Sequence, residues 1–142
     1  MFSIMKLLKK MFFIIEELEQ SDVEQHFLQE GFIQKENEAG TWIFLRQLKS
    51  NRWESVLLRG LNNGFNYCKV SFQDELAFKE NLTAALTVYG FKIIEDDVIK
   101  VLRNEEFILM FSQFEGVTFS ITLAKRNKEF EKDVSVEIHP LS

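Results

Sequence analysis

The residues best suited to chemistry are few in this chain, and they stand far apart in the sequence. The chain contains two histidines, His26 and His139, and one cysteine, Cys68. A zinc site needs clustered His and Cys ligands, and a cysteine nucleophile needs a base beside it. The segment Gly60–Gly64 lacks the lysine and the spacing of a phosphate-binding loop. We therefore expect no catalytic residues, no cofactor and no His/Cys metal site, and hence a protein that is not an enzyme.

Carboxylates are the remaining candidates for a metal site. Glu95, Asp96 and Asp97 form the densest acidic run, and three carboxylates can hold a divalent cation. Adjacent side chains on a strand point to opposite faces, however, and aspartate is common in turns because it bonds the local backbone. We interpret this run as a hairpin turn.

The net charge and the distribution of basic residues bear on whether the protein binds nucleic acid. The formal net charge of −5 disfavours general nucleic-acid binding, which needs clustered Lys and Arg. Residues 46–69 are nevertheless basic and carry aromatic residues that could stack on bases, so a local nucleic-acid surface is one alternative. The other interpretation is that these cations are the solvent faces of amphipathic strands. The basic residues are Arg46, Lys49, Arg52, Arg59 and Lys69.

The cellular location is inferred from the cysteine content and the hydropathy. A single cysteine cannot form an internal disulfide, which suits a reducing cytoplasm. The apolar run Met11–Ile15 is shorter than a signal peptide or a membrane-spanning helix requires. We expect a small acidic cytoplasmic protein.

The first predicted element is a helix over residues 3–19 with an unusually broad apolar face. Such a face is wider than one sheet contact requires, and Phe13 adds an aromatic ring on the charged side. Exposed apolar patches tend to be interaction sites, and a twofold dimer is a common way to cover one. We expect this helix to bind a partner and to form a homodimer; the alternatives are burial by the chain's own sheet and a membrane-surface helix. The residues assigned to the interface are Met5, Leu8, Phe12, Phe13 and Ile15.

A second strong helix is predicted over residues 74–89. Ser71 or Asp74 can cap its start, and Gly90 can take the left-handed conformation that ends a helix. The apolar residues recur at helical spacing and predict a buried stripe. The stripe consists of Phe78, Leu82, Ala85, Leu86 and Tyr89.

The rest of the chain alternates with the period of strands. Short polar turns separate the strands after Phe32, and short loops favour antiparallel neighbours because parallel strands need long crossovers. A second set of strands runs from Phe91 to Lys125, and Val134, Val136 and Ile138 alternate in a last edge strand. The predicted class is a single α+β domain over residues 1–142, with N-terminal helices, a mostly antiparallel sheet and the 74–89 helix packed on it.

The two halves of the chain are alike. Gly31-Phe32 and Gly90-Phe91 each follow a helix and precede strands, which indicates either an internal duplication or the common use of glycine to end a helix. The order helix, strands, helix, strands in a small acidic protein resembles the class I chaperones of type III secretion. That resemblance covers element order through about Val117, rests on no motif, and ends where the family has a final helix. It implies a cytoplasmic dimer that holds an extended segment of another protein.

These observations favour non-catalytic protein binding, as an adaptor, an escort chaperone or an inhibitor of another protein. An alternative of a different class is a carrier of a small apolar ligand. With 15 phenylalanines in the chain, the space between helix and sheet would be lined by aromatic rings. Nucleic-acid binding by the basic strands is the third interpretation.

Overall fold

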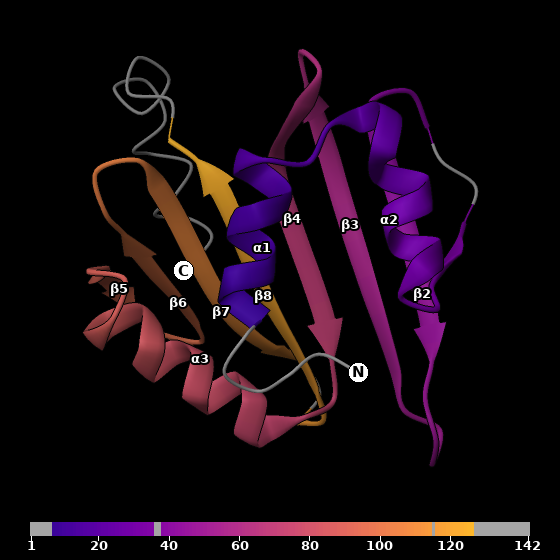
Figure 1. Cartoon of the computed structure of the whole chain (residues 1–142). Helices are drawn as coiled ribbons and strands as arrows, with labels where there is room; N and C mark the ends of the chain where they lie inside the picture. The colour runs from indigo at the N-terminus through magenta and orange to yellow at the C-terminus, as the bar shows by residue number, and fades with distance from the viewer. Residues whose placement is uncertain (1–6, 36–37, 115, 127–142) are drawn as a thin grey trace.

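The computed structural model describes residues 7–35, 38–114 and 116–126 (Figure 1). All the strands in these ranges belong to one antiparallel sheet. The α+β class, the N-terminal helices and the helix packed on the sheet are therefore confirmed. The strand expected at Val134, Val136 and Ile138 lies outside the described residues.

The first half of the chain builds two helices and a four-stranded meander. Its elements are α1 (Leu7–Glu16), the 3-10 turn η2 (Gln20–Asp22), α2 (Val23–Gln29), β1 (Ile33–Gln34), β2 (Thr41–Gln47), β3 (Trp53–Leu61) and β4 (Gly64–Phe72). The second half resembles the first in having a helix followed by four strands, but it has one helix, α3, where the first half has α1 and α2. Its elements are α3 (Glu75–Thr87), β5 (Lys92–Asp96), β6 (Ile99–Arg103), β7 (Phe107–Phe114) and β8 (Thr118–Lys125).

The strand order joins the two halves at the middle of the sheet. It runs β1-β2-β3-β4-β8-β7-β6-β5, so each half is a meander and the last strands of the two halves pair with each other. Val70 of β4 lies opposite Ile121 of β8 at this junction. A duplicated helix-plus-meander unit would produce this order, but strand order alone does not establish a common origin. The internal duplication stays a prediction.

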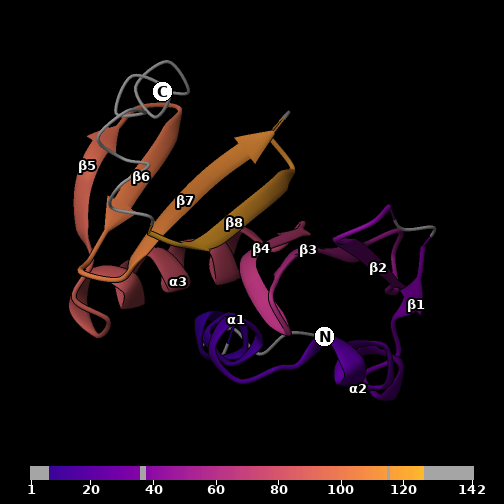
Figure 2. The same cartoon turned by 90° about the horizontal axis from the view of Figure 1, so that it is seen from above.

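The helices α1, α2 and α3 all lie on one side of the sheet (Figure 2). α1 crosses β4 and β8, where the two halves meet. α2 packs on β2, with Phe27 stacked on Phe44 at a ring-centroid distance of 4.4 Å. α3 lies against the second half, where Phe78 contacts the rings of Phe111 and Phe119 at 5.5 and 4.8 Å.

The ends of α3 follow the sequence prediction, and so does most of its predicted stripe, since Ala85 is buried and Phe78, Leu82 and Tyr89 pack half-buried against the core. Asp74 caps the helix by accepting a hydrogen bond from the backbone N–H of Ala77 at 3.0 Å, and Gly90 has a φ of +70°. Leu86, expected in the core, has 38% of its surface exposed. The fully buried line on α3 is instead Ala77, Asn81 and Ala85.

The physical reason for this shift is that α3 packs on two surfaces at once. The amide of Asn81 accepts from the backbone N–H of Leu8 at 3.3 Å and donates to the carbonyl of Ala77 at 2.7 Å. Asn81 therefore joins α3 to the backbone of α1 at Leu8 through a buried side chain. Side chains four residues apart share a face, so Ala77 and Ala85 lie beside it and Leu86 is turned outward.

The acidic run at residues 95–97 forms a turn, as expected. β5 ends at Asp96, and the side chain of Asp97 accepts a hydrogen bond from the backbone N–H of Val98 at 2.8 Å. The carboxylate of Asp96 pairs with Lys100 on the next strand. These bonds account for the local role of both aspartates without a metal ion.

Candidate functional site

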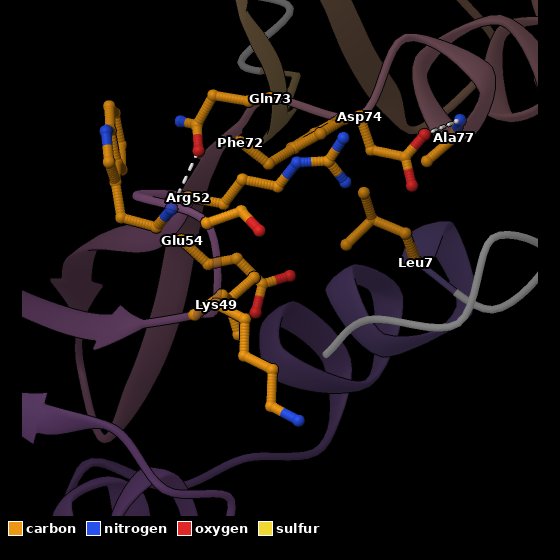
Figure 3. Close-up of a pocket in the computed structure, with 11 residues that line it drawn as sticks. Leu7, Lys49, Arg52, Glu54, Phe72, Gln73, Asp74 and Ala77 are labelled. Atoms are coloured by element: carbon orange, nitrogen blue, oxygen red, sulfur yellow. Dashed lines mark hydrogen bonds between the residues drawn. The ribbon is translucent and has the colours of Figure 1, made fainter.

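A pocket of about 540 Å³ opens where the β2–β3 hairpin, the β4–α3 junction and the first turn of α1 meet (Figure 3). Its position follows from the fold, because these three segments converge at one end of the central strands. Its apolar lining is Leu7, Leu48, Trp53, Phe72 and Ala77, and its polar lining is Lys49, Ser50, Arg52, Glu54, Gln73 and Asp74.

The hairpin side of this pocket is held in place by backbone geometry. Ser50 and Asn51 both have φ of +60°, the left-handed conformation that two-residue hairpin turns require. The backbone N–H of Leu48 donates to the carbonyl of Arg52 at 2.8 Å and closes the turn. The N–H of Trp53 donates to the side-chain oxygen of Gln73 at 2.7 Å, which ties the hairpin to the β4–α3 junction. These bonds hold the hairpin and the β4–α3 junction, which form two walls of the pocket, at a fixed distance from each other.

The acidic groups of the pocket already have partners. Glu54 accepts from the Nε and terminal nitrogen of Arg46 at 2.9 and 2.5 Å, and both side chains are largely buried. Arg46 also lies 4.3 Å from the ring centre of Phe32 and donates to the carbonyl of Glu30. Asp74 is engaged as the cap of α3. The negative charge that faces the pocket is thus largely compensated within the protein.

The two basic side chains of the pocket have no charged partner among the described residues. Lys49 and Arg52 are exposed, and neither forms an ion pair within the described ranges. Figure 3 shows the guanidinium of Arg52 extending across the cavity toward Asp74, while the ammonium of Lys49 points away from Asp74. The charge left available to an incoming group is positive.

The residues expected to form a protein interface are scattered by the fold. Leu8 and Ile15 are buried among the chain's own residues, so the expectation that they form an exposed patch is wrong. The reason is that α1 lies across the centre of the sheet, where its broad face is covered by strands and by α3. Phe12 is half-buried, with its ring 5.1 Å from that of Tyr89. Met5 lies outside the described residues.

Phe13 is the member of the predicted interface that remains accessible, with 44% of its surface exposed. Its ring lies 5.6 Å from that of His26 on α2. A shallow hollow of about 290 Å³ adjoins the pair, and its other lining residues include Glu17, Glu19 and Asp22. No Lys or Arg occurs between positions 11 and 34 of the sequence. The surface formed by the end of α1, η2 and α2 is therefore acidic and carries the exposed ring of Phe13, whereas the earlier part of α1 carries Lys9 and Lys10, the latter paired with Glu30.

The basic strands do not form one continuous stripe. Arg46 points to the helix side of the sheet, where it pairs with Glu54. Arg59 lies 4.6 Å from the ring centre of Tyr67, and strand alternation places it on the opposite face. Lys49 and Arg52 lie at the hairpin. Both interpretations of the basic segment, a nucleic-acid surface and the solvent face of strands, require an accessible Arg46, and its burial beside Glu54 corrects them for this residue.

The phenylalanines pack against one another rather than around an open space. Phe27, Phe32, Phe44, Phe65 and Phe111 are among the largest fully buried side chains. Phe72 forms part of the lining of the hairpin pocket, and Phe12 and Phe107 line a second, more open hollow of about 510 Å³ beside α1. A pocket lined mainly by phenylalanine is not found among the described residues.

The cysteine and the histidines, which could act in catalysis or bind a metal ion, do not form a common site within the described residues. Cys68 is fully buried in β4, and desolvation raises the pKa of its thiol, so the thiol stays protonated. His26 packs between the rings of Phe13 and Phe27. His139 lies outside the described residues. Within the described ranges, no three His, Cys, Asp or Glu side chains are placed to hold a metal ion.

Sequence reasoning did not identify the hairpin pocket. Its lining comes from three separate stretches, and the roles predicted for its residues were others: Asp74 as a helix cap, and Lys49 and Arg52 as part of the basic segment. The pair Ser50-Asn51 was recognised only as a polar turn, and nothing in the local pattern shows which segments meet across it. Leu7 and Arg52 reach the same cavity only because of the order of the strands and the place of α1 on the sheet.

No described helix has both the length and the apolar character needed to cross a membrane. The resemblance to secretion chaperones is not accompanied by a similar solved structure. Comparisons with family models, with curated proteins and with solved structures found no match to this chain.

Proposed function

We propose that this chain is a non-catalytic protein-binding module that contacts its partner through the outer face of α1 and α2. The observation that supports this most is the exposed ring of Phe13 within an acidic surface. Aromatic residues in the centre of a contact contribute a large share of binding energy, and surrounding charges set the choice of partner. The proposal covers an adaptor, an escort or an inhibitor in the cytoplasm.

The chemistry of this face defines the partner. Glu16, Glu17, Glu19, Asp22 and Glu24 are all exposed there. A partner that presents Lys and Arg around an apolar cavity would be steered to this face and would receive the ring of Phe13. An acidic partner would be repelled.

Self-association through α1 is a second form of the same proposal. A stable interface buries about 1,200–2,000 Å² in total, more than one phenylalanine supplies. A dimer would therefore also have to use α2, including Leu28, which is exposed. An antiparallel arrangement would bring Lys9 of one copy toward Glu16 and Glu17 of the other.

The proposal is tested with Phe13→Glu and with Phe114→Glu as the matched control. Phe114 is 47% exposed and lies near Lys69 on the opposite side of the sheet, so both changes replace an equally exposed ring with a carboxylate. We expect Phe13→Glu to lose proteins that the unchanged chain and Phe114→Glu both retain from an extract of the source cells, measured by quantitative mass spectrometry. Equal retention by all three forms would contradict the proposal.

The same three proteins test self-association by light scattering at micromolar concentration. A dimer that Phe13→Glu converts to a folded monomer, with Phe114→Glu still dimeric, is the expected result. A monomer for the unchanged chain would exclude the dimer while leaving the binding of another protein to be decided by the extract experiment.

A second candidate function is a small-ligand carrier. The specific observation that favours it is the pocket of about 540 Å³ at the hairpin, which falls in the size range of ligand sites. Its lining combines apolar residues with charged ones, whereas the sequence suggested a space lined by phenylalanine. A ligand of this pocket would therefore carry a polar group as well as an apolar part.

A further inference from the structure

We propose that the hairpin pocket binds a small amphipathic carboxylate, with the apolar chain in the pocket and the head group on Arg52. This inference rests on the second candidate function and is independent of protein binding by α1 and α2. Apart from Leu7, the residues that line the pocket lie outside α1 and α2, so each proposal can fail without the other.

The interior of the pocket suits an apolar chain. Leu7, Phe72 and Ala77 are all nearly inaccessible to solvent and form part of its wall. A hydrocarbon chain that enters is removed from water, which favours binding in proportion to the apolar surface buried. Four of the six polar lining residues, Lys49, Ser50, Arg52 and Glu54, belong to the hairpin side, so a ligand that fits the pocket is apolar at one end and polar at the other.

The charge of the ligand's head group is inferred from which charged side chains of the pocket already have partners within the protein. Glu54 is held by Arg46, and Asp74 is held as the cap of α3. A cationic ligand would have to compete with these contacts. Arg52 has no ion-pair partner among the described residues, and its planar guanidinium can bind both oxygens of a carboxylate.

The position of Arg52 is set before any ligand arrives. Its backbone carbonyl accepts from the N–H of Leu48 and from the side chain of Gln47, at 2.8 and 3.1 Å. The following residue, Trp53, is tied to Gln73 across the pocket. A backbone held in this way loses little freedom on binding, which favours affinity.

The test uses decanoate as the probe, titrated into the full chain below its micelle concentration and followed by calorimetry. We expect saturable binding at one site, and we expect Arg52→Gln to weaken it by about tenfold or more, because one charge-assisted pair is lost. Arg59→Gln is the matched control, since Arg59 is also an exposed arginine and lies on β3, away from the pocket. It should change the affinity by less than about twofold.

Decyltrimethylammonium serves as the probe of opposite charge, and amide chemical-shift changes locate the site. We expect weaker binding of the ammonium probe and, for decanoate, shifts at the hairpin and at the start of α3. The proposal is overturned by an absence of saturable binding, by equal binding of the two probes, or by equal losses in Arg52→Gln and Arg59→Gln. Phe13→Glu should leave decanoate binding unchanged, so failure here is distinguishable from failure of the protein-binding proposal.

Discussion

Asn81 shows how one polar side chain can connect two helices. It is only 1% exposed, although it lies on a helix that was expected to bury an apolar stripe. Its amide bonds the backbone of α1 through Leu8 and the backbone of its own helix through Ala77. Buried polar groups are tolerated when they are hydrogen-bonded in this way. The residue therefore determines how α3 is rotated against α1.

Asn81→Ala should lower the free energy of unfolding by about 1–3 kcal/mol, because it leaves the N–H of Leu8 without a partner in a buried site. Leu86→Ala should cost under about 1 kcal/mol, since Leu86 is partly exposed. Urea unfolding of the two variants measures both values. If Leu86→Ala cost as much as Asn81→Ala, the orientation of α3 described here would be wrong.

At the scale of elements, the pair formed by Arg46 and Glu54 connects β2, β3 and the end of α2. The two residues lie directly opposite each other in the β2–β3 register, and Arg46 reaches on to the carbonyl of Glu30. A buried ion pair adds little net stability when compared with apolar residues of similar size. Removing one member is different, because it leaves an uncompensated buried charge.

Glu54→Ala should destabilise the protein by about 3–5 kcal/mol for this reason. The matched control is Glu75→Ala, which breaks the exposed pair between Glu75 and Lys79 and should cost under about 1 kcal/mol. Combining Arg46→Met with Glu54→Leu should recover most of the stability lost in Glu54→Ala. Thermal unfolding would show the prediction to be wrong if Glu54→Ala and Glu75→Ala had equal effects.

At the scale of the whole molecule, the central strands β4 and β8 hold the two halves together. Cys68 lies on β4 between Leu58 of β3 and Leu123 of β8, and all three side chains are fully buried. Only global unfolding would be expected to expose this thiol, because both neighbouring strands cover it. Its ionisation therefore reports on the stability of the entire sheet.

The pH dependence of unfolding follows from the raised pKa of Cys68. The folded protein holds the thiol proton more tightly than the unfolded chain does. Below about pH 8.5 this group does not change the free energy of unfolding, and above it stability falls by up to about 1.4 kcal/mol per pH unit. Between pH 7 and pH 10 the unchanged protein should lose about 2 kcal/mol more than Cys68→Ala in urea unfolding. Parallel pH profiles for the two proteins would contradict this.

Local signals in the sequence were reliable where one segment determines its own structure. The cap at Asp74, the helix stop at Gly90 and the turn at Asp97 depend on bonds within a few residues, and all three are confirmed. The antiparallel strands follow from short loops, which leave no room for crossovers. Apolar periodicity predicts that a helix buries one face, but it does not determine which side chains at the edge of that face are buried, because this depends on how many neighbours the helix has.

The sequence by itself determined the class of fold and the presence of two sets of antiparallel strands, because hydrophobic period and turn chemistry act locally. The tertiary structure alone decided that β4 pairs with β8, that α1 is covered by the sheet while Phe13 stays exposed, and that Arg46 is withdrawn to Glu54. It also decided that Leu7 and Arg52 line one pocket. These features depend on contacts between residues distant in the chain, and such contacts are selected by packing the whole core rather than by any local pattern.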